Sequence, residues 1–266
     1  MHNISLSELN ILLLEPSDTQ RKIITSLLLK ENVGEIDSVS SIAEATTALK
    51  AHGADLVVSA MYFADGTALD LLRSMKENTE TASVPFMLVS SETKVSKLEE
   101  FKQAGIAAIL PKPFKPEHLT RALKASLDLI NEEELELELF DVEEVRVLLV
   151  DDSRLARNHI RRVLENMGLK KIDEAENGAE AVCSVKDNEY DLVVTDYNMP
   201  EMDGRELSEF IRFNPATAHI PIIMVTSENT KSAHMANIQQ TGVNALCDKP
   251  FEPELVRKML ASLLSD

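Results

Sequence analysis

The chain contains no tryptophan, only two cysteines and few aromatic residues of any kind. It is also poor in positive charge, since 27 Lys and Arg stand against 45 Asp and Glu and the formal net charge is −18. A protein that binds nucleic acid or an anionic membrane through phosphate contacts needs clusters of Lys and Arg. The acidic balance therefore argues against both kinds of partner.

The two cysteines, Cys183 and Cys247, lie among apolar residues and are not spaced as metal ligands. We expect both to be reduced and buried, in a protein that stays in the cytoplasm. The N-terminal residues MHNISLSELN lack the basic start and the long apolar region of a signal peptide. Apolar runs such as ILLL and VLLV are far too short to cross a bilayer, so no membrane segment is expected.

What the chain does contain is a long internal repeat. The segment DLVVSA at 55–60 matches DLVVTD at 191–196, and VPFMLVSSE at 84–92 matches IPIIMVTSE at 220–228. Both pairs are offset by 136 residues, a period far longer than that of a solenoid repeat. With 266 residues, 44% of them hydrophobic, the sequence predicts two tandem domains that each bury a core.

We place the two domains at residues 8–130 and 145–266. Between them, residues 131–144 (NEEELELELFDVEE) contain eight acidic and no basic residues. Such a composition predicts a solvated, self-repelling linker. The alternation of Leu with Glu favours an extended segment, and an extension of the preceding helix is the alternative.

The second domain reads as strands alternating with helices. VRVLLV, DLVVT, IPIIMVT and NALCD are apolar runs of strand length, and the patterns at 204–214, 232–241 and 253–264 predict helices. Ser153 is placed to cap a further helix with one apolar face. Five strands and five helices in each domain predict an α/β fold, in which a doubly wound, five-stranded parallel sheet is covered on both faces.

Polar residues stand at the ends of four of these strands. Asp151 and Asp152 follow VRVLLV in the first strand, and Asp196 follows DLVVT in the third. Thr226 ends IPIIMVT in the fourth strand, and Lys249 follows NALCD in the fifth. In a doubly wound sheet the carboxyl ends of the strands form one rim, where ligands bind. Three carboxylates repel one another there, and Mg²⁺ (or Mn²⁺), which prefers oxygen ligands, relieves the conflict. The rim therefore predicts a metal site at which a carboxylate accepts a phosphoryl group.

These residues carry a resemblance to a known family. Through LLVDDS, DLVVTDYNMPEMDG, PIIMVTSE and CDKPF, residues 145–266 resemble a chemotaxis-type receiver domain of bacterial two-component response regulators. The resemblance implies a flavodoxin-like sheet of strand order 2-1-3-4-5. It also implies that the histidine of a sensor kinase phosphorylates Asp196, and that the Lys249–Pro250 peptide bond is cis.

The resemblance also assigns roles to individual positions. Two of them, Asn198 and Glu228, tune hydrolysis of the aspartyl phosphate in the family. Leu246 departs from the family, which usually has Tyr or Phe there, and we expect it to pack as a core residue. The remaining positions bind the metal (Asp151 mainly through water, Asp152, Asp196 and the backbone carbonyl of Asn198) or contact the phosphoryl oxygens (Thr226, the backbone of Ser227, and Lys249).

The first domain resembles the same fold, but its site is incomplete. The acceptor position holds Ala60, and the loop after it is two residues shorter and begins with the apolar residues 61–63. We expect these side chains to crowd the place of the metal. Without a nucleophile the domain is identified as a degenerate receiver, or pseudo-receiver, whose Lys112 either pairs with Glu15 or is solvated. The degenerate site comprises Glu15, Pro16, Ala60, Ser90 and Lys112.

The leading hypothesis is a phosphorylation-controlled response regulator. A sensor histidine kinase or a phosphotransfer protein would supply the phosphoryl group, and a downstream protein effector would read the result on the surface formed by residues 231–265. The sequence leaves homodimerisation open. No DNA-binding output domain is expected, and the protein would catalyse its own phosphorylation and dephosphorylation rather than act as a turnover enzyme.

The sequence leaves open three alternatives to this function. The protein acts as an adaptor whose function does not depend on phosphorylation, or as a phosphate sink that drains a kinase. A metal-dependent phosphohydrolase is the third, although the six histidines form no cluster near the rim that would supply an acid or base.

Overall fold

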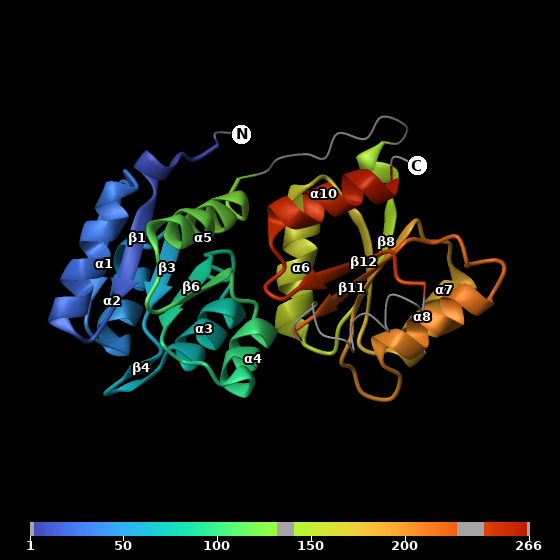
Figure 1. Cartoon of the computed structure of the whole chain (residues 1–266), viewed down its shortest axis with the longest axis horizontal. Coiled ribbons are helices and arrows are strands. Elements are labelled where there is room, and N and C mark those ends of the chain that lie inside the picture. Colours follow the sequence, from blue (N-terminus) through green and yellow to red (C-terminus); the bar gives the residue numbers. More distant parts are fainter. Residues whose placement is uncertain (1–2, 132–140, 228–241, 265–266) are drawn as a thin grey trace. The chain divides into compact units, whose positions relative to one another are not determined.

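The computed structural model describes residues 3–131, 141–227 and 242–264 (Figure 1). The chain divides into two compact units, Met1–Glu132 and Glu133–Asp266, which we call unit 1 and unit 2. Each unit contains one five-stranded parallel sheet. In the described ranges, no helix has the length and apolar character needed to span a membrane.

Unit 1 alternates strands with helices along the chain. Its sheet has the order β2-β1-β3-β6-β7, and a two-stranded hairpin of β4 and β5 follows β3. The strands are β1 (Asn10–Leu14), β2 (Glu35–Val39), β3 (Leu56–Ser59), β4 (Tyr62–Phe63), β5 (Gly66–Thr67), β6 (Phe86–Ser90) and β7 (Ala108–Pro111), and the helices are η1 (Leu6–Glu8), α1 (Asp18–Lys30), α2 (Ile42–His52), α3 (Ala68–Glu77), α4 (Val95–Gln103) and α5 (Pro116–Asp128).

Unit 2 repeats this arrangement. Its sheet has the order β9-β8-β10-β11-β12. The strands are β8 (Arg146–Val150), β9 (Lys171–Ala175), β10 (Leu192–Asp196), β11 (Ile222–Thr226) and β12 (Ala245–Asp248), and the helices are η2 (Val142–Glu144), α6 (Arg154–Asn166), α7 (Gly178–Asp187), α8 (Gly204–Phe213) and α10 (Pro253–Leu264). Counted within each five-stranded sheet, the strand order is 2-1-3-4-5 in both units, which confirms the predicted fold.

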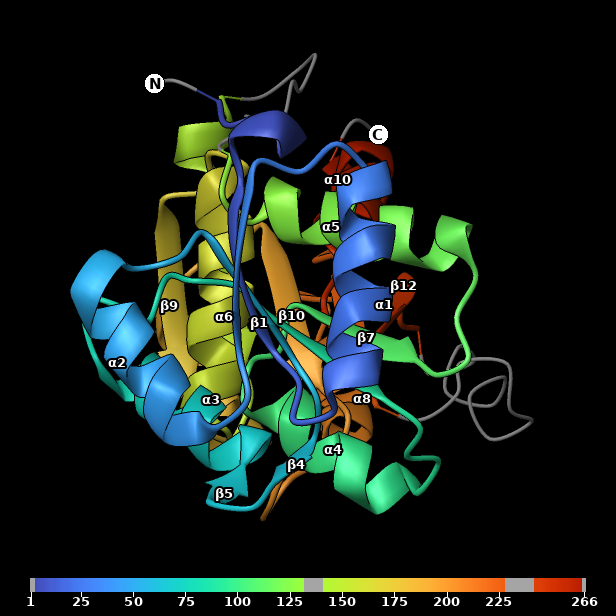
Figure 2. The same ribbon diagram turned by 90° about the vertical axis from the view of Figure 1, so that its left-hand side faces the viewer.

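The central strands are apolar throughout because helices cover both faces of each sheet. In β1, Ile11 and Leu13 pack with α1 and α5, and the whole strand from Ile11 to Leu14 is buried. Figure 2 shows α1 and α5 on one side of this sheet and α2 and α3 on the other. A parallel strand buried on both faces has no polar face to alternate with its apolar one, so it appears in the sequence as a continuous apolar run.

Short polar side chains fix where the helices begin. The predicted cap of α6 is present, because the Ser153 hydroxyl accepts a hydrogen bond from the backbone N–H of Ala156. Asp203 caps α8 in the same way, and Glu206 reaches back to the N–H of Asp203. These caps satisfy backbone N–H groups at the ends of the strand–helix loops, where the functional side chains also lie.

Several sequence-based expectations need correction or lie outside the described ranges. Cys247 is buried as predicted, but Cys183 is exposed, because it lies on the outward face of α7. Helix α5 ends at Asp128, so it does not extend into the acidic segment. The greater part of that segment, the helix predicted at 232–241 and Glu228 fall outside the residues that the structure describes.

Candidate functional site

The carboxyl ends of the strands of unit 2 bring together the predicted polar residues. Asp151, Asp196, Thr226 and Lys249 are all buried, with at most 4% of each residue exposed, whereas Asp152 is exposed. One carboxylate oxygen from each of Asp151, Asp152 and Asp196 lies within 4.8 Å of the other two. Fully buried charges of this kind are rare unless they are paired or bind a metal.

Lys249 joins two of these carboxylates. Its Nζ lies 2.8 Å from Oδ2 of Asp151 and 3.0 Å from Oδ2 of Asp196. Its backbone N–H donates to the carbonyl of Thr226, at 2.7 Å, which fixes the start of the loop after β12. The Lys249–Pro250 peptide bond is cis, as the resemblance implied.

Burial and charge act in opposite directions at this site. Burial raises the pKa of Asp151, and the nearby Lys249 ammonium and the hydrogen bond from the Ser153 N–H offset this only in part. Burial alone would lower the pKa of Lys249, but the carboxylates of Asp151 and Asp196 outweigh it and raise that pKa. One ammonium therefore stays charged and leaves the carboxylates incompletely neutralised, so a cation would be attracted to this cluster.

Asp196 is held at the end of β10 by its own neighbours. Its Oδ1 accepts a hydrogen bond from the backbone N–H of Tyr197 at 2.8 Å. Gly204, the first residue of α8, packs so closely that a Cβ there would lie 2.1 Å from the carbonyl oxygen of Asp196. Only glycine therefore fits at position 204, and the close approach draws the start of α8 against β10.

The sequence did not single out Arg157, which also supports the rim. This buried arginine of α6 donates to the backbone carbonyl of Asp151 at 2.6 Å, and it pairs with Glu174 at 3.1 Å and Glu176 at 2.9 Å. Arg21 donates to the carbonyl of Glu15 in the same way, at 2.7 Å. The recurrence of Arg at both positions of the repeat was the signal that would have identified it.

The other predicted residues lie around this cluster. Asn198 is exposed in the loop between β10 and α8, and Ser227 follows β11 and is half-buried. Glu228 lies outside the described residues. Leu246 is partly buried and packs against the core of unit 2, as expected.

Unit 1 keeps the ion pair of this site but not its carboxylate cluster. Nζ of Lys112 lies 3.1 Å from Oε2 of the buried Glu15, and Oε1 of Glu15 accepts from the N–H of Ser17 at 3.0 Å. These are the contacts that Asp151 makes with Lys249 and Ser153 in unit 2. Of the two alternatives left by the sequence, Lys112 pairs with Glu15 rather than being solvated.

The prediction that residues 61–63 crowd the rim of unit 1 is confirmed for Met61 but wrong for Tyr62. Met61 is buried, and its Sδ lies 3.5 Å from the Ser90 hydroxyl, whereas Tyr62 is 55% exposed. The β4–β5 hairpin begins at Tyr62, directly after Met61. It is held in place by Asp65, which accepts hydrogen bonds from the N–H groups of Ile42 and Ala43 at the start of α2. No group of three potential metal ligands is found in the described part of unit 1.

The donor set of unit 2, in contrast, fits a hard divalent cation. Three carboxylates lie close together, two of them buried, and Mg²⁺ binds carboxylate oxygens while it keeps several waters. The exposed position of Asp152 leaves solvent access for those waters. The charge conflict within the cluster is the one that such a cation removes.

Both units match one known family of domains. The model of the response regulator receiver domain matches residues 11–124 and again residues 147–261. The chain is 34% identical over 116 residues to the chemotaxis protein CheY-3 of Vibrio cholerae, which covers 44% of this chain and 88% of that protein. It is 38% identical over 121 residues to a CheY homologue of Campylobacter jejuni, and the match covers 45% of this chain and 92% of that protein. A solved structure of CheY4 from Vibrio cholerae is 30% identical in sequence, with a TM-score of 0.42, and the match covers 45% of this chain and 98% of that one.

Proposed function

This chain belongs to the response regulator receiver domain family and has two receiver domains in tandem. We propose that unit 2 is a phosphorylation switch and that unit 1 is not. The observation that carries the proposal is the difference between the two rims. Unit 2 has a cluster of three carboxylates joined to Lys249, whereas unit 1 has Ala60 in place of the acceptor Asp196.

In the proposed reaction, the phosphoryl donor is the phosphohistidine of a sensor kinase or of a phosphotransfer protein. A carboxylate oxygen of Asp196 attacks the phosphorus, so that an O–P bond forms while the P–N bond breaks and its electron pair returns to the imidazole. Mg²⁺ held by Asp151, Asp152, Asp196 and the Asn198 carbonyl would supply positive charge for the phosphoryl oxygens.

The residues of the chain orient and neutralise the reacting groups. The Tyr197 N–H fixes one oxygen of Asp196. Lys249 is already within 3.0 Å of the other oxygen and would follow the transferred group. The hydroxyl of Thr226 and the backbone of Ser227 stand at the end of the neighbouring strand and would donate to the phosphoryl oxygens. Asn198 and Glu228 would set how long the aspartyl phosphate lasts.

The product would be read by another protein. Phosphorylation adds about −1.5 to −2 charges at a buried rim, which biases the packing of the surrounding loops. We propose a downstream protein effector and, in line with the chemotaxis relatives, a signalling process. Unit 1 would bind a partner or a second copy rather than carry a phosphoryl group.

Intact mass spectrometry tests the proposal after incubation with acetyl phosphate and Mg²⁺. Wild type should gain one phosphoryl group, and Asp196→Asn or omission of Mg²⁺ should remove the gain. Asp187→Asn, an exposed carboxylate at the end of α7, serves as the matched control and should behave as wild type. An adduct that survives in Asp196→Asn would overturn the choice of acceptor. An effector that binds Asp196→Asn as well as the phosphorylated wild type would favour the adaptor alternative.

A further inference from the structure

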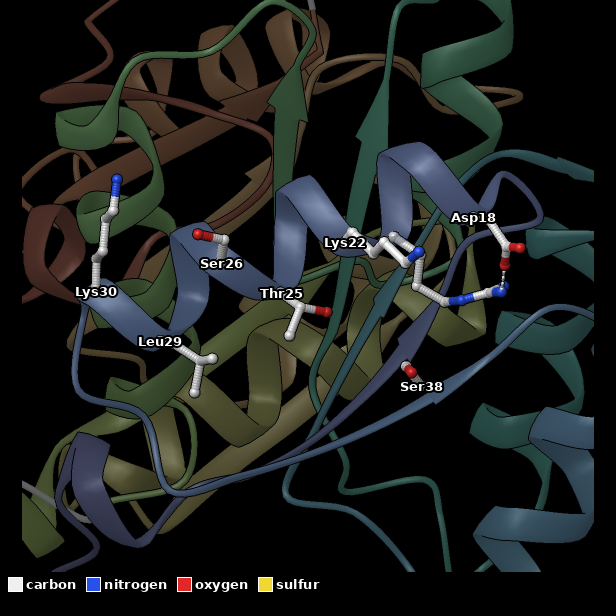
Figure 3. A pocket seen from close by; sticks show the side chains of 8 residues that line it. Asp18, Lys22, Thr25, Ser26, Leu29, Lys30 and Ser38 are labelled. Atoms are coloured by element: carbon white, nitrogen blue, oxygen red, sulfur yellow. Dashed lines mark hydrogen bonds and ion pairs between the residues drawn. The ribbon is translucent and has the colours of Figure 1, made fainter.

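A groove on unit 1 runs along α1 and has no part in the proposed reaction. It is formed between α1 and the edge strand β2, and its volume is about 660 Å³. Figure 3 shows its lining, in which Lys22, Thr25, Ser26 and Leu29 come from α1 and Ser38 comes from β2. The groove therefore combines hydroxyl groups, an apolar side chain and a positive charge.

The equivalent space in unit 2 is filled by an ion pair. Nε of Arg161 on α6 lies 2.6 Å from Oε1 of Glu174 on β9, and Arg161 also donates to a carbonyl of β9. The offset of 136 residues places Thr25 at the position of Arg161 and Ser38 at that of Glu174. The strand registers agree, because Ser38 pairs with Leu13 of β1 as Glu174 pairs with Leu149 of β8. The short side chains of Thr25 and Ser38 thus leave a space open in unit 1, whereas the longer Arg161–Glu174 ion pair fills the equivalent space in unit 2.

Of the three basic side chains along the groove, only one is paired with an acidic side chain within the described residues. Arg21 is paired with Asp18, as the dashed line in Figure 3 shows. Within the described residues, the ammonium groups of Lys22 and Lys30 take part in no ion pair, and both residues are exposed. They are eight residues apart on α1, which corresponds to about 12 Å along the helix axis. A single small anion cannot bridge that distance, but an extended chain with two negative charges can.

An extended peptide matches this spacing. Its residues advance about 3.3 Å each and alternate between faces, so carboxylates at positions i and i+4 lie on one face about 13 Å apart. Thr25 and Ser26 lie between the two lysines on α1 and offer hydroxyl donors, as Ser38 does from β2, and Leu29, which is 55% exposed, offers apolar contact. Strand β2 is at the edge of its sheet and pairs with β1 alone among the described strands, so its outer side is available to an added strand.

We propose that the α1–β2 groove of unit 1 binds an extended acidic segment of a partner protein, with carboxylates four residues apart contacting Lys22 and Lys30. A polyanion such as nucleic acid or an anionic membrane is disfavoured, because the chain as a whole carries a net charge of −18 and would be repelled. A short peptide with two carboxylates is repelled less, because it carries far fewer negative charges than a polyanion.

The test is a titration of the ¹⁵N-labelled full chain, followed by NMR at low salt, with two peptides of equal composition. SESLSES has its acidic residues four apart, and SSEELSS has them adjacent. The first should produce saturable shifts of the α1 and β2 amides but not of the α6 and β9 amides, and the second should bind several-fold more weakly. Phosphorylation is not required, so Asp196→Asn should bind SESLSES as wild type does, which separates this test from that of the proposed function.

Three variants complete the test. Lys22→Gln with Lys30→Gln should weaken binding about five-fold, as expected for two exposed ion pairs, whereas Lys50→Gln, which removes an exposed lysine of α2, should change nothing. Thr25→Arg with Ser38→Glu rebuilds the ion pair of unit 2 without changing the net charge and should abolish binding. The proposal is overturned if SESLSES causes no saturable shift at millimolar concentration, if both peptides bind equally, or if an oligonucleotide or anionic vesicle occupies the groove more tightly.

Discussion

The ammonium of Lys112 lies 3.1 Å from Oε2 of Glu15, in the place where Lys249 lies 2.8 Å from Oδ2 of Asp151. The longer Glu side chain thus makes the contact that Asp makes in the other unit. Unit 1 lacks the proposed acceptor carboxylate and the exposed carboxylate beside it, because Ala60 and Pro16 stand at those positions. The ion pair that remains joins the loop after β1 to the loop after β7.

Replacing Lys112 with Met should destabilise unit 1 by about 2 kcal/mol, because it leaves Glu15 buried without its partner. The cost is below that of a fully buried pair, since a quarter of the Lys112 side chain is exposed. Urea unfolding of the full chain, with hydrogen exchange resolved to β1 and β7, measures it. Lys50→Met is the control for loss of an exposed lysine, and an equal effect of both variants would mean that the pair contributes nothing.

Restoring the acceptor alone should not restore the chemistry of unit 1. In an Asp196→Asn background, Ala60→Asp should gain no phosphoryl group from acetyl phosphate and Mg²⁺, because Pro16 offers no carboxylate and the Met61 sulfur contacts Ser90. Intact mass spectrometry decides the point, with wild type as the positive control. A Mg²⁺-dependent adduct in this double variant would show that the neighbours of position 60 are not limiting.

The two thiols should differ sharply in reactivity. Cys183 is exposed, whereas Cys247 is fully buried, and burial together with the nearby Asp248 and Glu252 raises its pKa to about 12. Because the thiolate is the reactive form, one thiol per chain should react with an aromatic disulfide reagent in the folded protein and two in urea. Cys183→Ser should abolish the reaction of the folded protein. Rapid labelling of that variant would contradict the burial of Cys247.

Stability should fall at high pH through Tyr190. Burial and a hydrogen bond from its hydroxyl to Asp173 raise the pKa of Tyr190 to about 12, whereas an unfolded tyrosine titrates near 10. The folded state therefore favours the neutral phenol, so the contribution is complete below pH about 10 and is lost as the pH rises toward about 12. Urea midpoints across this range should fall more steeply for wild type than for Tyr190→Phe, and parallel curves would refute the assignment.

Much of the fold and of the candidate site follows from local sequence. The central strands β1, β3, β8 and β10 are buried on both faces, so their residues form continuous apolar runs that a single sequence displays. The edge strands β2 and β9 were counted among the five expected strands, but no apolar run located them in the sequence. Their residues, EIDSV and KIDEA, are largely exposed and polar, so only pairing with a neighbouring strand makes them part of the sheet.

The sequence by itself determined the repeat, the doubly wound topology and the residues that stand at the strand ends. Each buried parallel strand is a short contiguous apolar run followed by polar residues, so it can be recognised from the local sequence. Only the tertiary structure decided that Lys112 pairs with Glu15, that Arg157 holds the carbonyl of Asp151, that Cys183 faces outward, and that Thr25 and Ser38 leave a groove open. Each of these depends on the direction of a side chain or on contacts between residues distant in the chain, and neither is set by the local pattern.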